Sequence, residues 1–228
     1  MPNPILISIE GDIGAGKSTL IEQLKQQHPK WHFIDEPVGY WTSLKKEDGS
    51  NLLENFYKDT DRYAYTFQNC AVLTRAMEIQ RAVELWRKEC EYVPSEAENN
   101  VFVTERCLET DFHVFAKMMY DDGKLNKIEW DLYKMWYDYV QLKTPPLSGI
   151  VYLDTPAEIC KERIQQRNRK GEENIPLAYL ENLERYHKTW LFDSQASVPL
   201  LAYRNYGSRP HKVSDIGAWV NSAILPQV

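Results

Sequence analysis

A glycine-rich stretch near the N-terminus carries the clearest chemical signal in this sequence. Residues 11–18, GDIGAGKS, fit the pattern G-x-x-x-x-G-K-[ST] of a phosphate-binding loop. The glycines let the backbone turn tightly and bring its N–H groups close to phosphate oxygens. Lys17 is suited to the β- and γ-phosphates, and Ser18 is suited to Mg²⁺. The motif therefore predicts binding of a nucleoside triphosphate. The predicted nucleotide-binding residues of the loop are Gly11, Asp12, Ile13, Gly14, Ala15, Gly16, Lys17, Ser18 and Thr19.

Two apolar segments further along the chain end in charged residues. Residues 31–35 are followed by Glu36, and residues 101–104 are followed by Glu105-Arg106. When such segments are parallel strands, their carboxyl ends lie at one edge of the sheet, and ligands bind beyond that edge. We therefore expect these side chains to converge on the phosphate-binding loop.

Each of these charged residues has a chemical role and a plainer alternative. Glu36 is suited to accept a proton from a substrate hydroxyl, and the alternative is a helix-capping or ion-paired surface glutamate. Glu105 is suited to the water shell of Mg²⁺, and Arg106 to a transferring phosphate. The alternative for these two is a mutual salt bridge at the end of the strand.

A run of arginines, Arg163, Arg167 and Arg169, is the next signal. Phosphoryl transfer spreads negative charge over the equatorial oxygens, and a mobile arginine can meet that charge. Arg163 and Arg167 are four residues apart, so on a helix they share a face and repel each other unless an anion lies between them. The sequence GEE at 171–173 suggests a flexible flap. We interpret residues 163–173 as a lid, and the alternative is a solvated helix face.

The longest helical pattern in the sequence carries candidates for base recognition. The amide of Gln68 offers a base edge one donor and one acceptor, and Phe67 can stack on a base, with Tyr57 nearby. A plain core role is the alternative for the aromatic residues. Arg75 would be unusual in a core without an anionic partner. Asp111, at the start of another helix, is either that partner or a helix N-terminal charge.

The positions of these residues depend on a regular alternation of strands and helices. The strands that we expect are residues 5–9, 31–35, 101–104, 149–153 and 198–203, of which 5–9 and 101–104 should be buried. The helices that we expect are residues 18–27, 61–88, 110–119, 127–143, 156–167, 176–191 and 214–224. Polar loops are expected at residues 42–51 and 89–100. The alternation predicts an α/β fold with a five-stranded parallel sheet flanked by helices, formed by residues 1–228 as a single domain.

The helix expected at residues 127–143 has a stripe that is too aromatic for a solvent-facing surface. The stripe consists of Trp130, Tyr133, Trp136, Tyr137 and Val140. A place in the core is the ordinary interpretation of such a stripe. The stronger alternative is a homodimer interface built from a pair of helices.

Composition excludes several other classes of protein. The chain has 228 residues and a net charge of −6, which argues against a nucleic-acid polymer as the main partner. Its four cysteines are scattered, so we expect reduced thiols. No run of 18 apolar residues is present, and the first strand leaves no room for a signal peptide. We therefore expect a cytoplasmic protein without a membrane span, with an organellar presequence already removed as the alternative.

Five motifs follow one another along the chain: IEGDIGAGKST, DEPV followed by Trp41, RYAYTFQ with Arg75, TERCLETDFHVFA, and ERIQQRNRKGEENIPLAYL. In this order they resemble the deoxynucleoside kinases of the deoxycytidine/deoxyguanosine kinase type, over residues 5–191. The resemblance implies a P-loop nucleoside kinase fold that forms homodimers through helices, here residues 61–88 and 127–143. It also implies transfer of the γ-phosphoryl of ATP or another nucleoside triphosphate to the 5′-hydroxyl of a deoxynucleoside, with Mg²⁺.

The resemblance implies roles for individual residues as well. Gln68 resembles the glutamine that pairs with the base, and Tyr57 with Glu172 resembles the pair that holds the 3′-hydroxyl. The implied catalytic residues are Glu36, Arg106, Lys17, Arg163 and Arg167. Beyond the loop, the implied donor-binding residues are Arg167 and Arg169, and the implied Mg²⁺-binding residues are Ser18 and Glu105. The implied deoxynucleoside-binding residues are Glu36, Trp41, Tyr57, Phe67, Gln68, Arg75, Arg106, Asp111, Phe115 and Glu172.

Some residues depart from the family pattern. Cys107 stands where the family usually has serine, the loop after Trp41 is shorter than in the vertebrate enzymes, and the segment after Val198 matches weakly. Arg75 and Asp111 match the pair found in members that accept cytosine or purine bases, so we expect thymidine to be a poor substrate.

Two rival functions remain at this stage. A nucleoside monophosphate kinase would need a cationic site where Glu36 stands. A non-catalytic nucleotide-dependent switch protein would turn over no nucleoside, and the sequence has no convincing guanine-binding motif.

Overall fold

The five expected strands form one parallel sheet in the computed structural model, which describes residues 2–169, 172, 175–193, 197–204 and 213–224. The strands are β1 (Ile5–Glu10), β2 (His32–Ile34), β3 (Val101–Glu105), β4 (Leu147–Asp154) and β5 (Leu200–Arg204). Their order is β2-β3-β1-β4-β5, so β1 is central and pairs with β3 and β4. The predicted α/β fold is confirmed, and β1 delivers the glycine-rich loop at the middle of the carboxyl edge.

Helices surround the sheet. The α-helices are α1 (Lys17–Gln27), α2 (Val38–Ser43), α3 (Leu52–Lys58), α4 (Thr60–Tyr92), α5 (Leu108–Thr110), α6 (Lys117–Asp121), α7 (Lys127–Gln141), α8 (Ala157–Arg167), α9 (Leu177–Lys188) and α10 (Val213–Trp219). The described part also has a 3₁₀-helix, η1 (Pro94–Glu98), and π-helical turns at η2 (Asp111–Ala116), η3 (Thr189–Asp193) and η4 (Val220–Ile224).

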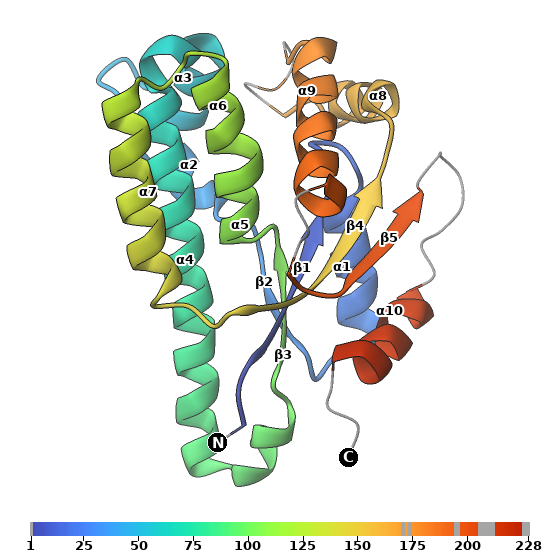
Figure 1. Cartoon of the computed structure of the whole chain (residues 1–228). Helices are drawn as coiled ribbons and strands as arrows, with labels where there is room; N and C mark the ends of the chain where they lie inside the picture. The colour runs from blue at the N-terminus through green and yellow to red at the C-terminus, as the bar shows by residue number, and fades with distance from the viewer. Residues whose placement is uncertain (1, 170–171, 173–174, 194–196, 205–212, 225–228) are drawn as a thin grey trace.

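The helices divide into groups around the sheet (Figure 1). Helices α1 and α10 pack together on one side, and α4 packs against α7 and β2 on the other. Helices α8 and α9 stand beyond the carboxyl ends of the strands, where the arrowheads of β4 and β5 point. Among the described residues, no helix is long and apolar enough to cross a membrane.

The centre of the core is β1, which is covered on both faces. Ile7 and Ile9 are fully buried on one face, and the polar side chains of Ser8 and Glu10 are equally buried on the other. Ser8 donates a hydrogen bond to Glu10, which satisfies one oxygen of this carboxylate. A strand buried on both faces is what an all-parallel sheet requires, and this position fixes the loop that follows β1.

Several sequence-based boundaries were wrong. The helix expected at 61–88 continues to Tyr92, because nothing interrupts it before Val93 and Pro94. Helices α2 and α3 were not expected, although α3 begins with a capping box formed by Asn51 and Glu54. The helix expected at 110–119 begins at Leu108 and contains the π-turn η2. The helices expected at 176–191 and 214–224 also end in π-turns.

Candidate active site

The glycine-rich loop joins β1 to α1 and is held in a conformation that excludes larger residues. Gly14 has φ +86°, and a Cβ atom there would lie 2.5 Å from the carbonyl oxygen of Cys160. Gly16 has φ 100° and caps α1, so the loop ends at the amino end of that helix. Lys17 donates a hydrogen bond to the carbonyl oxygen of Asp12 at 2.8 Å. The loop therefore surrounds its own lysine, as a phosphate-binding loop does.

Lys17, Ser18 and Glu105 form the first charged cluster at the carboxyl edge of the sheet. Ser18 Oγ donates to Glu105 Oε2 at 2.9 Å, and Lys17 Nζ lies 3.7 Å from Glu105 Oε1. Burial and the nearby Arg106 lower the pKa of Lys17, while Glu105 acts in the opposite direction. The serine hydroxyl and the carboxylate are hard oxygen ligands and fit Mg²⁺, which takes one or two protein oxygens together with phosphate and water. Among the described residues there is no cluster of three histidine, cysteine or acidic side chains that would form an all-protein metal site.

Glu36 and Arg106 form the second cluster. Arg106 Nη1 donates to Glu36 Oε1 at 2.5 Å, and the cation lies 5.2 Å from the centre of the Phe115 ring. Arg106 has φ 63°, a left-handed conformation that is uncommon for a non-glycine residue. The alternative of a mutual Glu105–Arg106 salt bridge is not what the structure shows, because Glu105 bonds to Ser18 instead.

The charge of Glu36 is set by the arginines around it. Burial alone would raise the pKa of this carboxyl, but Arg106 and Arg75 outweigh burial and lower its pKa to about 2. The side chain of Glu36 is only 15% exposed, so it is a buried ion-paired carboxylate and not a surface residue. It is therefore ionised at neutral pH.

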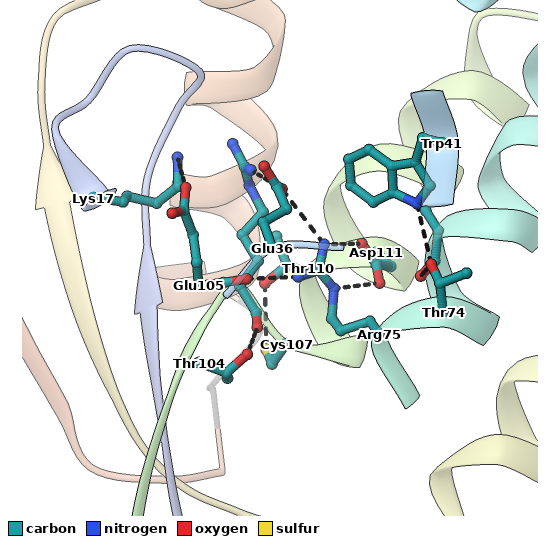
Figure 2. Close-up of polar contacts among 12 residues, drawn as sticks. Lys17, Glu36, Trp41, Thr74, Arg75, Thr104, Glu105, Cys107, Thr110 and Asp111 are labelled. Carbon is teal, nitrogen blue, oxygen red and sulfur yellow. Dashed lines mark hydrogen bonds and ion pairs between the residues drawn. The ribbon is translucent and has the colours of Figure 1, made fainter. Parts of the chain in front are cut away.

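Arg75 links the two clusters to Asp111 (Figure 2). Its Nε donates to Asp111 Oδ2 at 2.8 Å, and its Nη1 donates to the backbone oxygen of Glu105 at 2.6 Å. Its Nη2 lies 3.6 Å from Glu36 Oε1. Burial opposes the charge of Arg75, but Asp111 and Glu36 raise its pKa, so the guanidinium stays protonated. Asp111 is thus the partner of Arg75, as the sequence suggested.

An apolar wall with one amide lies beside these charges. Phe67 packs edge-on against Trp41, with ring centres 5.2 Å apart, and stacks on Phe56 at 4.4 Å. Trp41 donates to Thr74 Oγ1 at 3.0 Å, which fixes its indole. Gln68 is 1% exposed, and within the described residues its Nε2 has no hydrogen-bond partner. An unpaired buried amide donor next to a pocket is suited to a polar ligand edge.

The arginines of the expected lid have different contacts. Arg163 donates to the Ala15 carbonyl oxygen at 3.2 Å, so it contacts the glycine-rich loop. Arg167 and Arg169 both pair with Glu172, the latter at 3.2 Å. Residues 170–171 and 173 of the expected lid lie outside the described residues. The alternative, a solvated helix face, therefore does not describe Arg163. It still applies in part to Arg167 and Arg169, whose side chains are more than one-third exposed.

One pocket brings most of these groups together, although Ser18 and Arg163 do not line it. It is lined by every predicted deoxynucleoside-binding residue, by Lys17 and Glu105, and by Ile13, Gly14, Arg167 and Arg169 of the predicted donor set. Two further residues, Leu53 and Ala71, line it as well. Leu53 was not predicted because α3 was not predicted, although the capping box at Asn51 was a usable signal.

A parallel sheet with this loop, facing a pocket with a carboxylate and arginines, defines a phosphotransferase of the P-loop nucleoside kinase fold. The family model for deoxynucleoside kinases matches residues 7–221, and the chain belongs to this family. It is 36% identical to deoxycytidine kinase 2 of Gallus gallus, with 92% of this chain and 81% of the relative covered. It is 34% identical to deoxycytidine kinase of Homo sapiens, with 86% and 81% covered, and 33% identical to mitochondrial deoxyguanosine kinase of Xenopus laevis, with 86% and 79% covered.

These relationships confirm the resemblance found in the sequence. The chain is a deoxynucleoside kinase, an enzyme that transfers a phosphoryl group from a nucleotide donor to an alcohol acceptor. The rival functions, a nucleoside monophosphate kinase and a non-catalytic switch protein, are set aside.

Proposed function

We propose that this kinase uses ATP or another nucleoside triphosphate, with Mg²⁺, to phosphorylate the 5′-hydroxyl of deoxycytidine or a purine deoxynucleoside. The observation that carries the substrate choice is the buried Arg75–Asp111 pair in the wall of the pocket. Relatives of this chain are named deoxycytidine kinase and deoxyguanosine kinase, which supports the same choice.

The base is recognised by groups that are fixed before it binds. Gln68 offers one donor and one acceptor to the base edge, between the rings of Phe67 and Phe115. The paired charges of Arg75 and Asp111 leave polar groups where thymine would place its 5-methyl group. A polar mismatch of this kind discriminates between substrates by up to about 10⁴-fold. Thymidine is therefore disfavoured.

The sugar is held by further polar groups of the pocket. Tyr57 and Glu172 both line it and are suited to the 3′-hydroxyl. Burial raises the pKa of the Tyr57 phenol well above its usual value, so the phenol keeps its proton and can donate a hydrogen bond. Trp41 closes the apolar side of the pocket.

Glu36 acts on the 5′-hydroxyl. A carboxylate with a pKa near 2 is a weak proton acceptor, so its first role is to accept a hydrogen bond and orient the hydroxyl. The hydroxyl becomes acidic only as its bond to phosphorus forms, and the proton then passes to Glu36 late in the transfer. Arg106, already bonded to Glu36, is placed to stabilise the phosphoryl group that approaches the same oxygen.

The donor is held on the opposite side of Glu36. Loop residues 11–19 bind the phosphates through backbone N–H groups and Lys17, and Arg163, Arg167 and Arg169 supply further positive charge. Ser18 and Glu105 would hold Mg²⁺, which supplies charge neutralisation between the phosphates when it is bound. We propose residues 163–173 as a lid within one kinase domain.

The protein forms a homodimer through α4 and α7 in our proposal. Both helices expose apolar side chains, and α7 is the more apolar of the two, with Met135 at 68% exposure. The exposed set comprises Leu73, Met77, Leu85 and Tyr92 on α4, and Ile128, Leu132, Met135, Trp136 and Tyr139 on α7. Of the aromatic stripe on α7, Trp130, Tyr133, Tyr137 and Val140 are buried in the core, whereas Trp136 is half exposed and belongs to this surface. In sedimentation, Met135→Glu should give monomers and the surface variant Lys127→Ala should stay dimeric.

The substrate proposal is tested by a panel of the four deoxynucleosides and their monophosphates with ATP and Mg²⁺. Deoxycytidine, deoxyguanosine or deoxyadenosine should have the highest kcat/KM, and thymidine should be at least about 100-fold poorer. Equal turnover of thymidine contradicts the role of the Arg75–Asp111 pair.

A further inference from the structure

Asp12, the second residue of the glycine-rich loop, points away from the pocket toward helix α9. Its side chain is 1% exposed, and its Oδ1 lies 3.1 Å from Nδ1 of His187, which is completely buried. Within the described residues, neither carboxylate oxygen of Asp12 has a hydrogen-bond partner, so the contact with His187 is an ion-pair approach and not a hydrogen bond. A buried carboxylate with one neighbour depends on that neighbour, so His187 is the group that fixes this side chain.

The surroundings of His187 place a proton on its Nδ1. This nitrogen lies 2.9 Å from the carbonyl oxygen of Leu183 and 3.1 Å from Asp12, and both neighbours are acceptors. The other ring nitrogen, Nε2, has no partner among the described residues. The ring stacks on Tyr152, with centres 5.8 Å apart, and meets Phe115 edge-on at 6.5 Å. Packing fixes the ring, Nδ1 is hydrogen-bonded to the Leu183 carbonyl oxygen, and the same edge of the ring lies against the carboxylate of Asp12.

The backbone of Asp12 connects this contact to the donor site. Its carbonyl oxygen accepts hydrogen bonds from Lys17 Nζ at 2.8 Å and from the backbone N–H of Ala15 at 3.1 Å. A rotation of residue 12 would therefore move the acceptor that orients Lys17 and would also open the first turn of the loop. The side chain of Asp12 thus contacts α9, and its backbone carbonyl oxygen accepts hydrogen bonds within the loop.

We propose that His187 is a positioning residue for the phosphoryl donor. It holds Asp12, and through Asp12 it holds the glycine-rich loop in the conformation that receives the triphosphate. This inference rests on the proposed role of the loop as the donor site. It predicts that loss of the polar Nδ1 edge beside Asp12 weakens binding of the donor nucleotide and leaves the deoxynucleoside side of the pocket unchanged.

Two substitutions at His187 separate positioning from packing. His187→Phe keeps an aromatic ring against Tyr152 but removes the donor, whereas His187→Asn loses ring packing but keeps an N–H donor near the place of Nδ1. A third variant, Leu180→Ala, removes a fully buried side chain from the same helix but leaves His187 and Asp12 unchanged. Each variant is assayed for KM of ATP, KM of the best deoxynucleoside, kcat and thermal stability.

His187→Phe should raise the KM for ATP about tenfold, the size expected when a buried carboxylate loses its one polar neighbour, with the KM of the deoxynucleoside within about twofold. His187→Asn and Leu180→Ala should lower the melting temperature but keep the KM for ATP within about threefold. An unchanged KM for ATP in His187→Phe, or an equal rise in His187→Asn, overturns the proposal. If His187→Phe does not fold, Asp12→Ala breaks the same contact and must give the same selective loss. Failure of the kinase function itself would already be visible in the unsubstituted protein.

Discussion

The two sides of the pocket hold their arginines in different ways. On the deoxynucleoside side, Arg75 is 2% exposed and its donors are directed at Asp111 and at the backbone of Glu105. On the donor side, Arg167 and Arg169 are 37% and 39% exposed, and both pair with one carboxylate, Glu172. In the first arrangement both charges are buried and bonded to the fold, and in the second two partly exposed arginines share one buried carboxylate within a short segment.

This difference fits two separate tasks, selection of the deoxynucleoside on one side of the pocket and transfer of the phosphoryl group on the other. A buried charge without its partner is strongly disfavoured, so Arg75 cannot leave Asp111 to accommodate a different base. Arg167 and Arg169 are more than one-third exposed, so one of them can move to a phosphate while the other keeps the buried Glu172 paired. We infer that the rigid side sorts the substrates and that the half-exposed side adjusts to the transferring group.

The largest effect is expected at Glu36, which lies between the two sides. Glu36→Gln keeps the shape of the side chain but removes the proton acceptor, so kcat should fall about 10²–10⁴-fold while deoxynucleoside binding survives. Steady-state kinetics and binding titration measure the two quantities separately. Near-native kcat in this variant would show that Glu36 is not the base.

The next effect tests the rigidity of the deoxynucleoside side. Arg75→Met alone leaves Asp111 buried without a partner and should reduce the free energy of unfolding by about 3–5 kcal/mol. The double variant Arg75→Met with Asp111→Ala should recover part of that stability and raise thymidine phosphorylation relative to the unsubstituted enzyme. Arg75 also bonds to the Glu105 backbone and lies near Glu36, so the kcat of the double variant with deoxycytidine should fall.

Chemical denaturation and the four-nucleoside panel measure these outcomes. Asp111→Ala alone serves as the matched control, because it leaves Arg75 without its carboxylate. Its stability and its thymidine turnover should be no higher than those of Arg75→Met. If thymidine turnover does not rise in the double variant, the charged pair does not set the choice of base.

Residues next to strand ends were the most predictable part of the site. The glycine-rich loop, Glu36, Glu105 and Arg106 follow apolar strands, and the topology of a parallel sheet forces their convergence. The strands β1, β3 and β4 were found because a strand buried on both faces leaves a continuous apolar run in the sequence.

Contacts between distant segments were not predictable from local patterns. The spacing of residues gives no indication that Arg75 bonds to the backbone of Glu105, or that Asp12 meets His187. The π-turn that carries Asp111 and Phe115 inserts a residue into a helix, which shifts side chains from the expected face. Leu53 was missed for a different reason, because the capping box of α3 was not used.

A smaller effect is expected in acid, where Glu36 can be tested as an ion pair. The folded-state pKa of about 2 lies below the usual value of 4.5, so the ionised carboxylate stabilises the fold. That contribution is complete above pH 4.5 and is lost as the pH falls toward 2. Compared with Glu36→Gln, the unsubstituted protein should lose about 2 kcal/mol of relative stability between pH 5 and pH 3. Denaturation at both pH values measures this, and a constant difference would mean that Arg106 and Arg75 do not hold the charge.

The smallest effect is expected on the donor side, where the arginines are half exposed. Arg167→Ala should lower kcat about tenfold, the size of one charged contact in the transition state, with a much smaller change in the KM of the deoxynucleoside. Arg169→Ala should have a weaker effect of the same kind, because Asn168 in a left-handed conformation separates Arg169 from the end of α8. Arg185→Ala, which removes an exposed arginine of α9 outside the pocket, is the matched control.

Glu172 makes the lid experiment more informative, because it pairs with both arginines and also lines the deoxynucleoside pocket. If the two sides work separately, Glu172→Gln should raise the KM of the deoxynucleoside and Arg167→Ala should lower kcat. If Arg167 serves mainly to orient Glu172, both variants should raise the same KM and leave kcat nearly intact. A loss of stability without any change in the kinetics of the folded enzyme would instead show that Arg167 is a solvated residue at a helix end, with no role in catalysis.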